Sequence, residues 1–283
     1  MSAKAKNIFA LNGLKNTNGL DHRQIPVVNI FWTGGWDSTF RIVSLAGKEV
    51  IIRPYYIKEN RKSEWHELNA MSVIRKELIN RESTKCILNP VEILKVSDIP
   101  EDPEITDAYN YFRQKCHIGS QYEWLSRFAK KKKGVELGIL KNGGICNLIK
   151  THGKIKTVKS GTLGTKYLLD HSVSSREIIT LFGNFHFPLI ELNKAEMKKE
   201  AEVKGFIDIM NKTVFCHRPK DNKPCGECPP CNQAINDGMK YRFSDSALYR
   251  YRIKKLKEKV RLLLSRTGLV SVPNKSIPHN TFP

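Results

Sequence analysis

The chain has 283 residues, enough for one large α/β domain or for a domain with a small satellite. Hydrophobic residues make up 40% of it, so global disorder is not expected. The formal net charge of +20 either attracts polyanions or only reflects solvated, lysine-rich faces. The sequence has no apolar run that could span a bilayer and no apolar leader. We therefore expect a cytoplasmic protein with no membrane partner.

Strand-like and helix-like segments alternate along the chain, which predicts an α/β fold with a doubly wound parallel sheet. Such sheets bind ligands beyond the carboxyl ends of their strands. The segments expected in chain order are a flexible arm (1–22), strands (26–32 and 50–57), a helix (65–79), a short strand in "CIL" or "VEILKV", an acidic turn-rich stretch (101–111), a helix (120–134), a strand (135–140), a capped helix (193–206), a basic amphipathic helix (244–266) and an irregular tail (268–283). We place the main α/β domain at residues 23–210, and a smaller segment with the basic helix at 211–267.

The stretch "TGGWDST" follows the first predicted strand. Gly34 and Gly35 permit positive φ and close backbone approach to a ligand, and successive N–H groups there can bind an anion. Ser38 and Thr39 can donate to phosphate, whereas Asp37 needs a bridging Mg²⁺. The alternative is an ordinary strand-to-helix turn with Asp37 or Ser38 as the N-cap. The pattern is neither a P-loop nor a G-x-G-x-x-G fingerprint.

This turn resembles the S-G-G-x-D-S motif of the PP-loop ATP pyrophosphatases, with a threonine replacing the first serine. The resemblance implies an adenine nucleotide alpha hydrolase-like fold. It also implies cleavage of ATP between the α and β phosphates, with AMP transferred to a substrate oxygen. Asp37 and Ser38 would be catalytic, and the implied ATP-binding residues are Thr33, Gly34, Gly35, Asp37, Ser38 and Thr39.

Four of the seven cysteines lie in one short stretch, "CHRPKDNKPCGECPPC". Without an export signal, such a cluster indicates a metal site before it indicates disulfides. Cys216, Cys225, Cys228 and Cys231 suit a closed, structural, tetrahedral Zn²⁺ site. An iron–sulfur cluster is the alternative, and it also takes four cysteines. His217 is a further candidate to replace one cysteine.

The cysteine spacing together with the turn resembles the 7-cyano-7-deazaguanine synthase branch of the queuosine pathway. That branch has a C-x8-C-G-x-C-x-x-C zinc site, and "FPLIELNKAEMKKEAEVKGF" resembles its P-L-I-D-L-x-K-x-E segment. The resemblance spans about residues 26–236. Two parts depart from it. Residues 141–175 replace the substrate segment of the branch, and "HIGSQ" replaces its Arg-Asn pair.

The resemblance implies an ATP-dependent ligase that adenylates a carboxylate or amide oxygen, after which ammonia or another nucleophile displaces AMP. The expected partners are ATP and a small carboxylate-like substrate or nucleic acid, and the expected cofactors are Mg²⁺ and Zn²⁺. A homodimer is the assembly considered. The alternatives are a tRNA- or nucleic-acid-modifying PP-loop enzyme and a non-catalytic nucleotide- and nucleic-acid-binding subunit. Candidates to assist the leaving pyrophosphate are Lys58, Arg61 and Lys166, and candidates on the substrate side are His117, Asp170 and His171.

Overall fold

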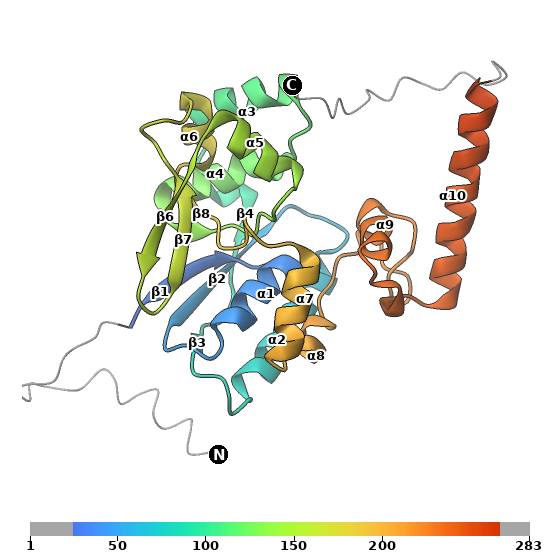
Figure 1. The fold of residues 1–283 in the computed structure, drawn as a ribbon, viewed down its shortest axis with the longest axis horizontal. Coiled ribbons are helices and arrows are strands. Elements are labelled where there is room, and N and C mark those ends of the chain that lie inside the picture. Colours follow the sequence, from blue (N-terminus) through green and yellow to red (C-terminus); the bar gives the residue numbers. More distant parts are fainter. Residues whose placement is uncertain (1–24, 267–283) are drawn as a thin grey trace, which may run out of the picture.

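Alternating strands and helices follow one another through residues 25–266, the part of the chain that this computed structural model describes (Figure 1). The predicted arm (1–22) and tail (268–283) lie outside the described residues. The strands are β1 (Val27–Phe31), β2 (Ile51–Lys58), β3 (Ile87–Leu88), β4 (Glu92–Lys95), β5 (Val135–Glu136), β6 (Ile155–Ser160), β7 (Gly164–Leu169) and β8 (Phe185–His186). The helices are α1 (Trp36–Leu45), α2 (Glu64–Ile79), α3 (Pro103–Lys115), α4 (Gln121–Lys131), α5 (Gly144–His152), α6 (Arg176–Phe182), α7 (Lys194–Val203), α8 (Ile207–Met210), α9 (Pro229–Asn236) and α10 (Asp245–Arg266), with 3₁₀ turns at Val96–Asp98 and Lys240–Arg242.

The central sheet is parallel throughout, in the order β3-β2-β1-β5-β8. Both candidates for the short third strand form strands, because β3 and β4 pair in succession with the same edge of β2. The sheet grows outward in one direction from β1 to β2 and in the other from β1 to β5. This topological switch point is where open α/β sheets bind their ligands.

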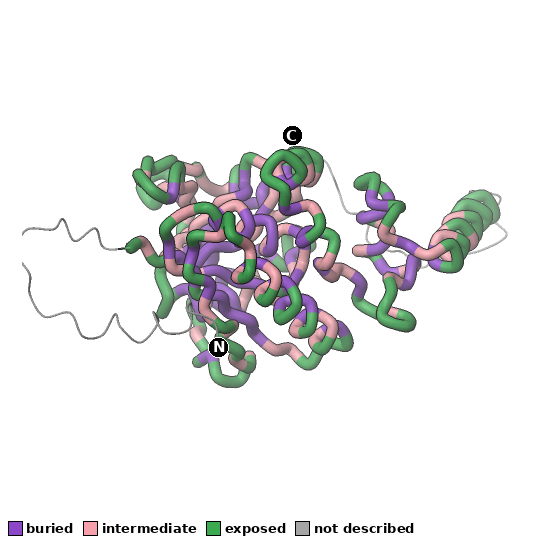
Figure 2. Tube along the Cα trace, turned by 90° about the horizontal axis from the view of Figure 1, so that it is seen from below, coloured by how far each residue is buried: buried purple, intermediate pink, exposed green. Residues whose placement is uncertain are grey.

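Helices cover both faces of the sheet, which confirms the doubly wound architecture (Figure 1). Successive side chains of a strand point to opposite faces. Ile30 and Trp32 accordingly pack into one core with α1, α2, α7 and α8, while Phe31 packs into the other with α3, α4, α5 and α6. The buried chain forms the interior of this body in Figure 2, and exposed residues surround it.

Two predicted segments differ from the structure. The stretch 101–111 is not a succession of turns, because α3 occupies most of it. Asp102 caps this helix by accepting a hydrogen bond from the Ile105 N–H (3.2 Å), and Pro103 occupies the first turn. The strand expected at 135–140 ends at Glu136, after which the chain bends into the loop before α5.

The capped helix expected at 193–206 is confirmed as α7. The Asn193 side chain accepts from the Glu196 N–H (3.0 Å), and the Glu196 carboxylate accepts from the Asn193 N–H (2.7 Å). This reciprocal pair is a capping box. It fixes the start of α7 at the carboxyl edge of the sheet, beside the turn after β1.

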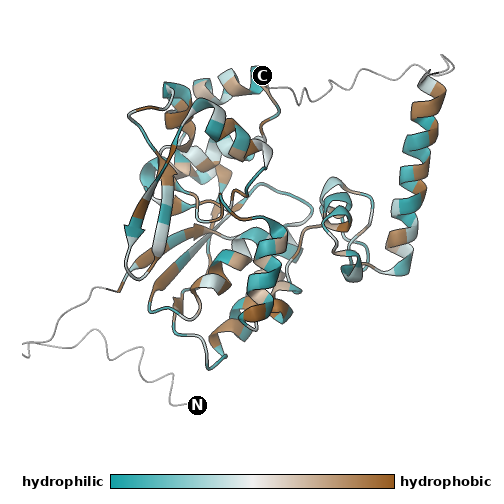
Figure 3. Ribbon diagram, in the orientation of Figure 1, coloured by the Kyte–Doolittle hydropathy of each residue, from teal (hydrophilic) through white to brown (hydrophobic). Residues whose placement is uncertain are grey.

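Two parts extend from the central body (Figure 1). The first is the antiparallel hairpin β6–β7, whose strand β6 is mostly exposed and whose strand β7 is mostly half-buried or buried. The second is the segment from residue 211 onward, which carries α9 and the long helix α10 predicted from the sequence. The apolar positions Leu256, Val260 and Leu263 of α10 are 58%, 46% and 60% exposed, and brown and teal alternate along this helix in Figure 3. Among residues 25–266, no helix has the length and apolar character needed to cross a membrane.

Candidate nucleotide site and cysteine cluster

The glycine turn lies at the carboxyl end of β1, between α2 and the segment 211–216. Gly34 has a φ of 65°, and a Cβ added there would lie 2.9 Å from the Glu67 carbonyl oxygen of α2. The Gly34 carbonyl accepts a hydrogen bond from the Val214 N–H at 2.9 Å. A side chain at Gly34 would therefore be strained in its backbone and would collide with α2.

The hydroxyl groups of the turn fall into two environments. Thr33 is exposed and Ser38 is half-buried, with their Oγ atoms 3.4 Å apart. The Thr33 N–H also donates to Ser38 Oγ (3.3 Å). Thr39 is fully buried, and its Oγ1 accepts from the Trp32 indole N–H at 2.9 Å. The structure thus brings Thr33 and Ser38 together at the surface and places the Thr39 side chain in the core instead.

Asp37 lies in the first turn of α1 and faces a cavity of about 500 Å³ between the ends of β1 and β5. Its Oδ1 atom is buried and has no hydrogen-bond partner among the described residues, although the residue as a whole is only half-buried. Burial raises the pKa of Asp37 to about 6, while Lys194 lowers it and Asp237 raises it. Gly138 brings β5 close, since a Cβ there would lie 3.5 Å from Asp37 Cβ.

A divalent cation fits the chemistry of Asp37. Mg²⁺ prefers oxygen ligands, and it is usually held by one or two carboxylates together with substrate phosphates. The unpaired Oδ1 of Asp37 is such a ligand. The carboxylate of Asp237 is already used, because it accepts from Lys194 Nζ at 2.9 Å and from Gln233 Nε2 at 2.7 Å. Asp37 is therefore the residue that would hold the ion.

Lys194 and Asp237 were not anticipated from the sequence, yet both line the same cavity as Asp37. Lys194 is the lysine of the stretch that resembles P-L-I-D-L-x-K-x-E, so a signal for it was present. Asp237 follows α9, and no pattern in the sequence connected it with a turn two hundred residues earlier. Cys146 and the loop before α5 complete this wall of the cavity.

The cations suggested for the leaving pyrophosphate are either ion-paired elsewhere or far from the turn. Lys58 Nζ lies 4.0 Å from a Glu64 oxygen, and Arg61 forms an ion pair with Glu67 at 3.2 Å. Lys166 lies on β7, beside β8 and thus away from β1. The structure does not bring these three side chains to the Asp37 cavity.

The residues suggested for the substrate side are also dispersed. His117 is exposed in the connection between α3 and α4. Asp170 ends the β6–β7 hairpin, where hydrogen bonds from Ser172 hold its pKa below the usual value. The His171 ring lies 3.1 Å from the Gly183 carbonyl oxygen. None of the three lines the cavity that contains Asp37.

The four clustered cysteines converge on one point. Their buried sulfur atoms all lie within 4.8 Å of one another, with Cys225 and Cys231 separated by 3.8 Å and Cys216 and Cys228 by 3.9 Å. A tetrahedral zinc with bonds of about 2.3 Å has edges of about 3.8 Å. These separations fit a single ion better than a multi-iron cluster, whose thiolates are spread over several iron atoms. Zinc therefore fits this site, whereas His217 is exposed and lies outside the group.

Backbone groups support the cysteine cluster. The Cys225 N–H donates to Cys216 Sγ (3.2 Å), and the Cys228 N–H donates to Cys225 Sγ (3.4 Å). Gly226 has a φ of 81°, and a Cβ there would lie 2.1 Å from the Ala247 carbonyl oxygen of α10. Glycine is thus required where the cluster touches α10. Arg250 secures the same contact by donating to the Cys225 carbonyl at 2.9 Å.

Residues 174–239 match the family described as queuosine biosynthesis protein QueC. The match runs from the start of α6 through α7 and the cysteine cluster to the end of α9, and it supports the resemblance to that PP-loop branch over this part of the chain. The match also favours ATP-using chemistry. The glycine turn and the hairpin β6–β7 lie outside it. No curated protein matches this chain.

Proposed function

We propose that this protein is an ATP-dependent ligase that adenylates an oxygen of an acceptor, with Asp37 and the turn Thr33–Ser38 as the ATP site. The observation that carries the proposal is the buried Oδ1 of Asp37, without a partner among the described residues, beside a glycine turn at the switch point of the sheet. A carboxylate in that state lacks a cation, and the turn offers backbone N–H groups to an anion. Magnesium-bound triphosphate would satisfy both.

The residues of the turn and the cavity have distinct roles in this proposal. The N–H groups at the start of α1 and the hydroxyl groups of Thr33 and Ser38 bind the phosphates that leave. Asp37 holds Mg²⁺, which neutralises phosphate charge when it is bound. Lys194 lines the same cavity but is ion-paired with Asp237 at 2.9 Å, so the pair adds little net charge, and its role is to orient the triphosphate by hydrogen bonding. Catalysis then depends mainly on positioning and on electrostatic stabilisation.

The chemistry proceeds in two displacements. An acceptor carboxylate or amide oxygen attacks the α-phosphorus of ATP, the bond to the bridging oxygen breaks, and pyrophosphate leaves. Ammonia or another nucleophile then attacks the activated carbon. AMP departs with the former acceptor oxygen, and the nucleophile loses one proton. Similarity to QueC supports these two reaction steps over the non-catalytic alternative. The presence of both Asp37 and Ser38 supports them as well.

A nucleic-acid acceptor is the second candidate, and the hairpin β6–β7 favours it. Lys154, Lys156 and Lys159 are exposed on β6 or next to it, in the segment that replaces the expected substrate segment. Only Lys156 of these three has an ion-pair partner among the described residues, since its Nζ lies 3.6 Å from Asp170. An exposed basic ribbon of this kind suits phosphate contacts.

The test is AMP and pyrophosphate release from labelled ATP, with fractions of a cell extract supplying the acceptor. We expect one fraction to stimulate release by the wild type and not by Ser38→Ala. Ser83→Ala, which removes an exposed hydroxyl far from the turn, is the matched control and should behave like the wild type. Undiminished pyrophosphate release by Ser38→Ala would refute the assignment of the turn.

A further inference from the structure

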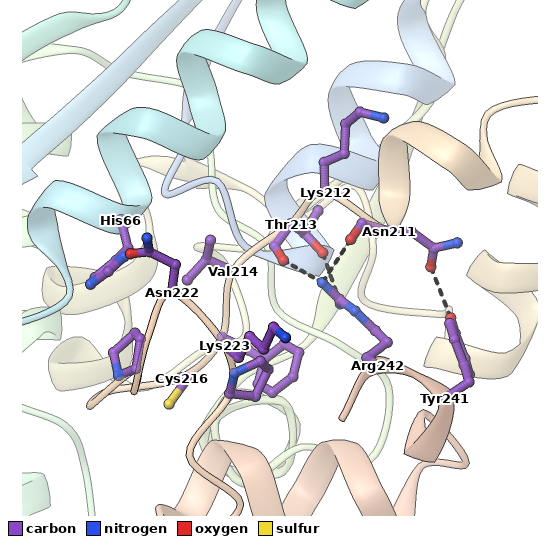
Figure 4. A pocket seen from close by; sticks show the side chains of 13 residues that line it. His66, Asn211, Lys212, Thr213, Val214, Cys216, Asn222, Lys223, Tyr241 and Arg242 are labelled. Carbon is purple, nitrogen blue, oxygen red and sulfur yellow. Dashed lines mark hydrogen bonds between the residues drawn. The ribbon is translucent and has the colours of Figure 1, made fainter. Parts of the chain in front are cut away.

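A second cavity, of about 460 Å³, lies beside the glycine turn, bounded by the start of α2, residues 211–216 and the cysteine loop (Figure 4). It shares a wall with the turn, because Val214 lines the cavity and donates its N–H to the Gly34 carbonyl. Its lining contains the basic side chains of His66, Lys212, Lys223 and Arg242, and no described aspartate or glutamate. The ATP proposal uses none of these groups.

Arg242 is the most unusual member of this cavity. Its guanidinium donates to Thr213 Oγ1 (3.1 Å), to the Asn211 carbonyl (3.1 Å) and to the Thr213 carbonyl, and it lies 4.8 Å from the centre of the Phe215 ring. All of these partners are neutral. Burial lowers the pKa of Arg242 to about 10, as expected for a cation without a compensating carboxylate.

The lysines of the cavity differ in their availability. Lys212 forms an ion pair with Glu77 at 3.2 Å, and Figure 4 shows its side chain turned away from the other labelled residues. Lys223 is exposed at the mouth of the cavity and has no acidic partner within ion-pair distance among the described residues. Arg242 and Lys223 therefore leave two positive charges uncompensated at this wall.

A purely structural role for Arg242 would be to tie residues 211–213 to the turn Lys240–Arg242. That role needs donors for two carbonyls and a hydroxyl, which the guanidinium provides, but it does not need an anionic or acidic partner. Burying a cation costs several kcal/mol unless an anion accompanies it. Arg242 is only half-buried, so this cost is reduced, but its charge still lines a cavity with no described acidic residue, and a bound anion would balance it.

We propose that this cavity binds the oxyanion group, a carboxylate or a phosphate monoester, of a small molecule. Arg242 and Lys223 bind the charged oxygens, and the rings of Phe215 and Tyr241 contact the apolar part of the ligand. Because the cavity shares a wall with the glycine turn, a ligand bound there lies next to the proposed ATP site and would serve as the acceptor of the reaction. This last role rests on the proposed function, whereas the binding site itself does not.

The test is calorimetric titration of the zinc-loaded full-length protein with phenyl phosphate and with benzoate, in the absence of ATP. We expect the wild type to bind at least one probe, and the preferred probe identifies the oxyanion. Arg242→Gln should weaken binding about tenfold or more, and Lys223→Gln should weaken it several-fold, since each removes a charged hydrogen bond. Lys133→Gln, a change of the same charge on an exposed residue, is the matched control.

Ser38→Ala separates this site from the nucleotide site, because it should leave probe binding unchanged while it abolishes ATP turnover. Probe binding that is lost in Ser38→Ala and kept in Arg242→Gln would place the anion at the turn and overturn the proposal. Absence of binding to the wild type would do the same. If Arg242→Gln releases zinc or unfolds, the Lys223→Gln titration decides, and unchanged affinity there refutes the site.

Discussion

Replacing Asp37 with asparagine should stabilise the protein while abolishing ATP turnover. Asparagine resembles the neutral carboxyl group, so it avoids the cost of burying a charge. The rise of the Asp37 pKa from 3.8 to about 6 corresponds to about 3 kcal/mol, at roughly 1.4 kcal/mol per pKa unit. Because the amide brings a new donor that needs a partner, we expect a net gain of about 1 to 3 kcal/mol at pH 7.

The effect has a definite dependence on pH. The folded pKa of Asp37 lies above its unfolded value, so protonation stabilises the native state. This contribution is fully present below pH 3.8 and is lost as the pH rises through about 6. The difference in stability between Asp37→Asn and the wild type should therefore be largest above pH 7 and small near pH 4.

Thermal melting of the zinc-loaded, magnesium-free protein from pH 4 to pH 8 measures this difference. For a domain of this size, at roughly 2 °C per kcal/mol, the expected gain raises the melting temperature by about 2 to 6 °C at pH 7. Asp107→Asn, on the exposed side of α3, should change neither the melting temperature nor its pH dependence by a comparable amount. The reasoning fails if Asp37→Asn melts at or below the wild-type temperature at pH 7, or if it still releases pyrophosphate.

Two further outcomes are expected. Purified protein should contain about one zinc ion per chain. Cys225→Ser should lose the ion and aggregate, because structural zinc contributes on the order of 10 kcal/mol to the folding free energy of small metal-dependent units. Elemental analysis that finds iron would contradict this. The binding constant for RNA or DNA should fall with salt concentration at a log–log slope of about −0.7 to −0.9 per phosphate contact. Replacing Lys154, Lys156 and Lys159 with glutamate should eliminate binding. The same replacements at residues 131–133 should not. Absence of binding at low salt would favour a small-molecule or protein acceptor.

Local signals in the sequence predicted the local structure well. The β-branched run before the turn became β1, and the Asn193 and Glu196 pair became the cap of α7. The spacing of the cysteines predicted the convergence of their sulfur atoms. By contrast, helix α3 was not predicted. Its apolar positions are separated by polar residues, and its first turn around Pro103 consists of residues that are also common in turns.

The composition of the cavities could not be read from local patterns, because each cavity joins residues that are far apart in the chain. Asp37 meets Lys194 and Asp237 only because the order of the sheet places α7 and α9 beyond the carboxyl end of β1. The burial of the Thr39 hydroxyl has a different, local cause, since its partner Trp32 is only seven residues away. An indole N–H in the core needs an acceptor, and a threonine one helical turn inside α1 supplies it.

The cysteine cluster and the glycine turn form one connected structure. The chain leaves Gly34, and at residue 214 it returns to donate to the Gly34 carbonyl, two residues before the first cysteine. Arg242, after α9, holds residues 211 and 213 from the other side. The cysteine cluster therefore fixes one end of the strip 211–216, which lines the second cavity, and Arg242 fixes the other end. If the glycine turn binds ATP as proposed, a closed four-cysteine site with no open position would affect catalysis without touching a substrate, because its stability sets the position of the strip that donates to the Gly34 carbonyl.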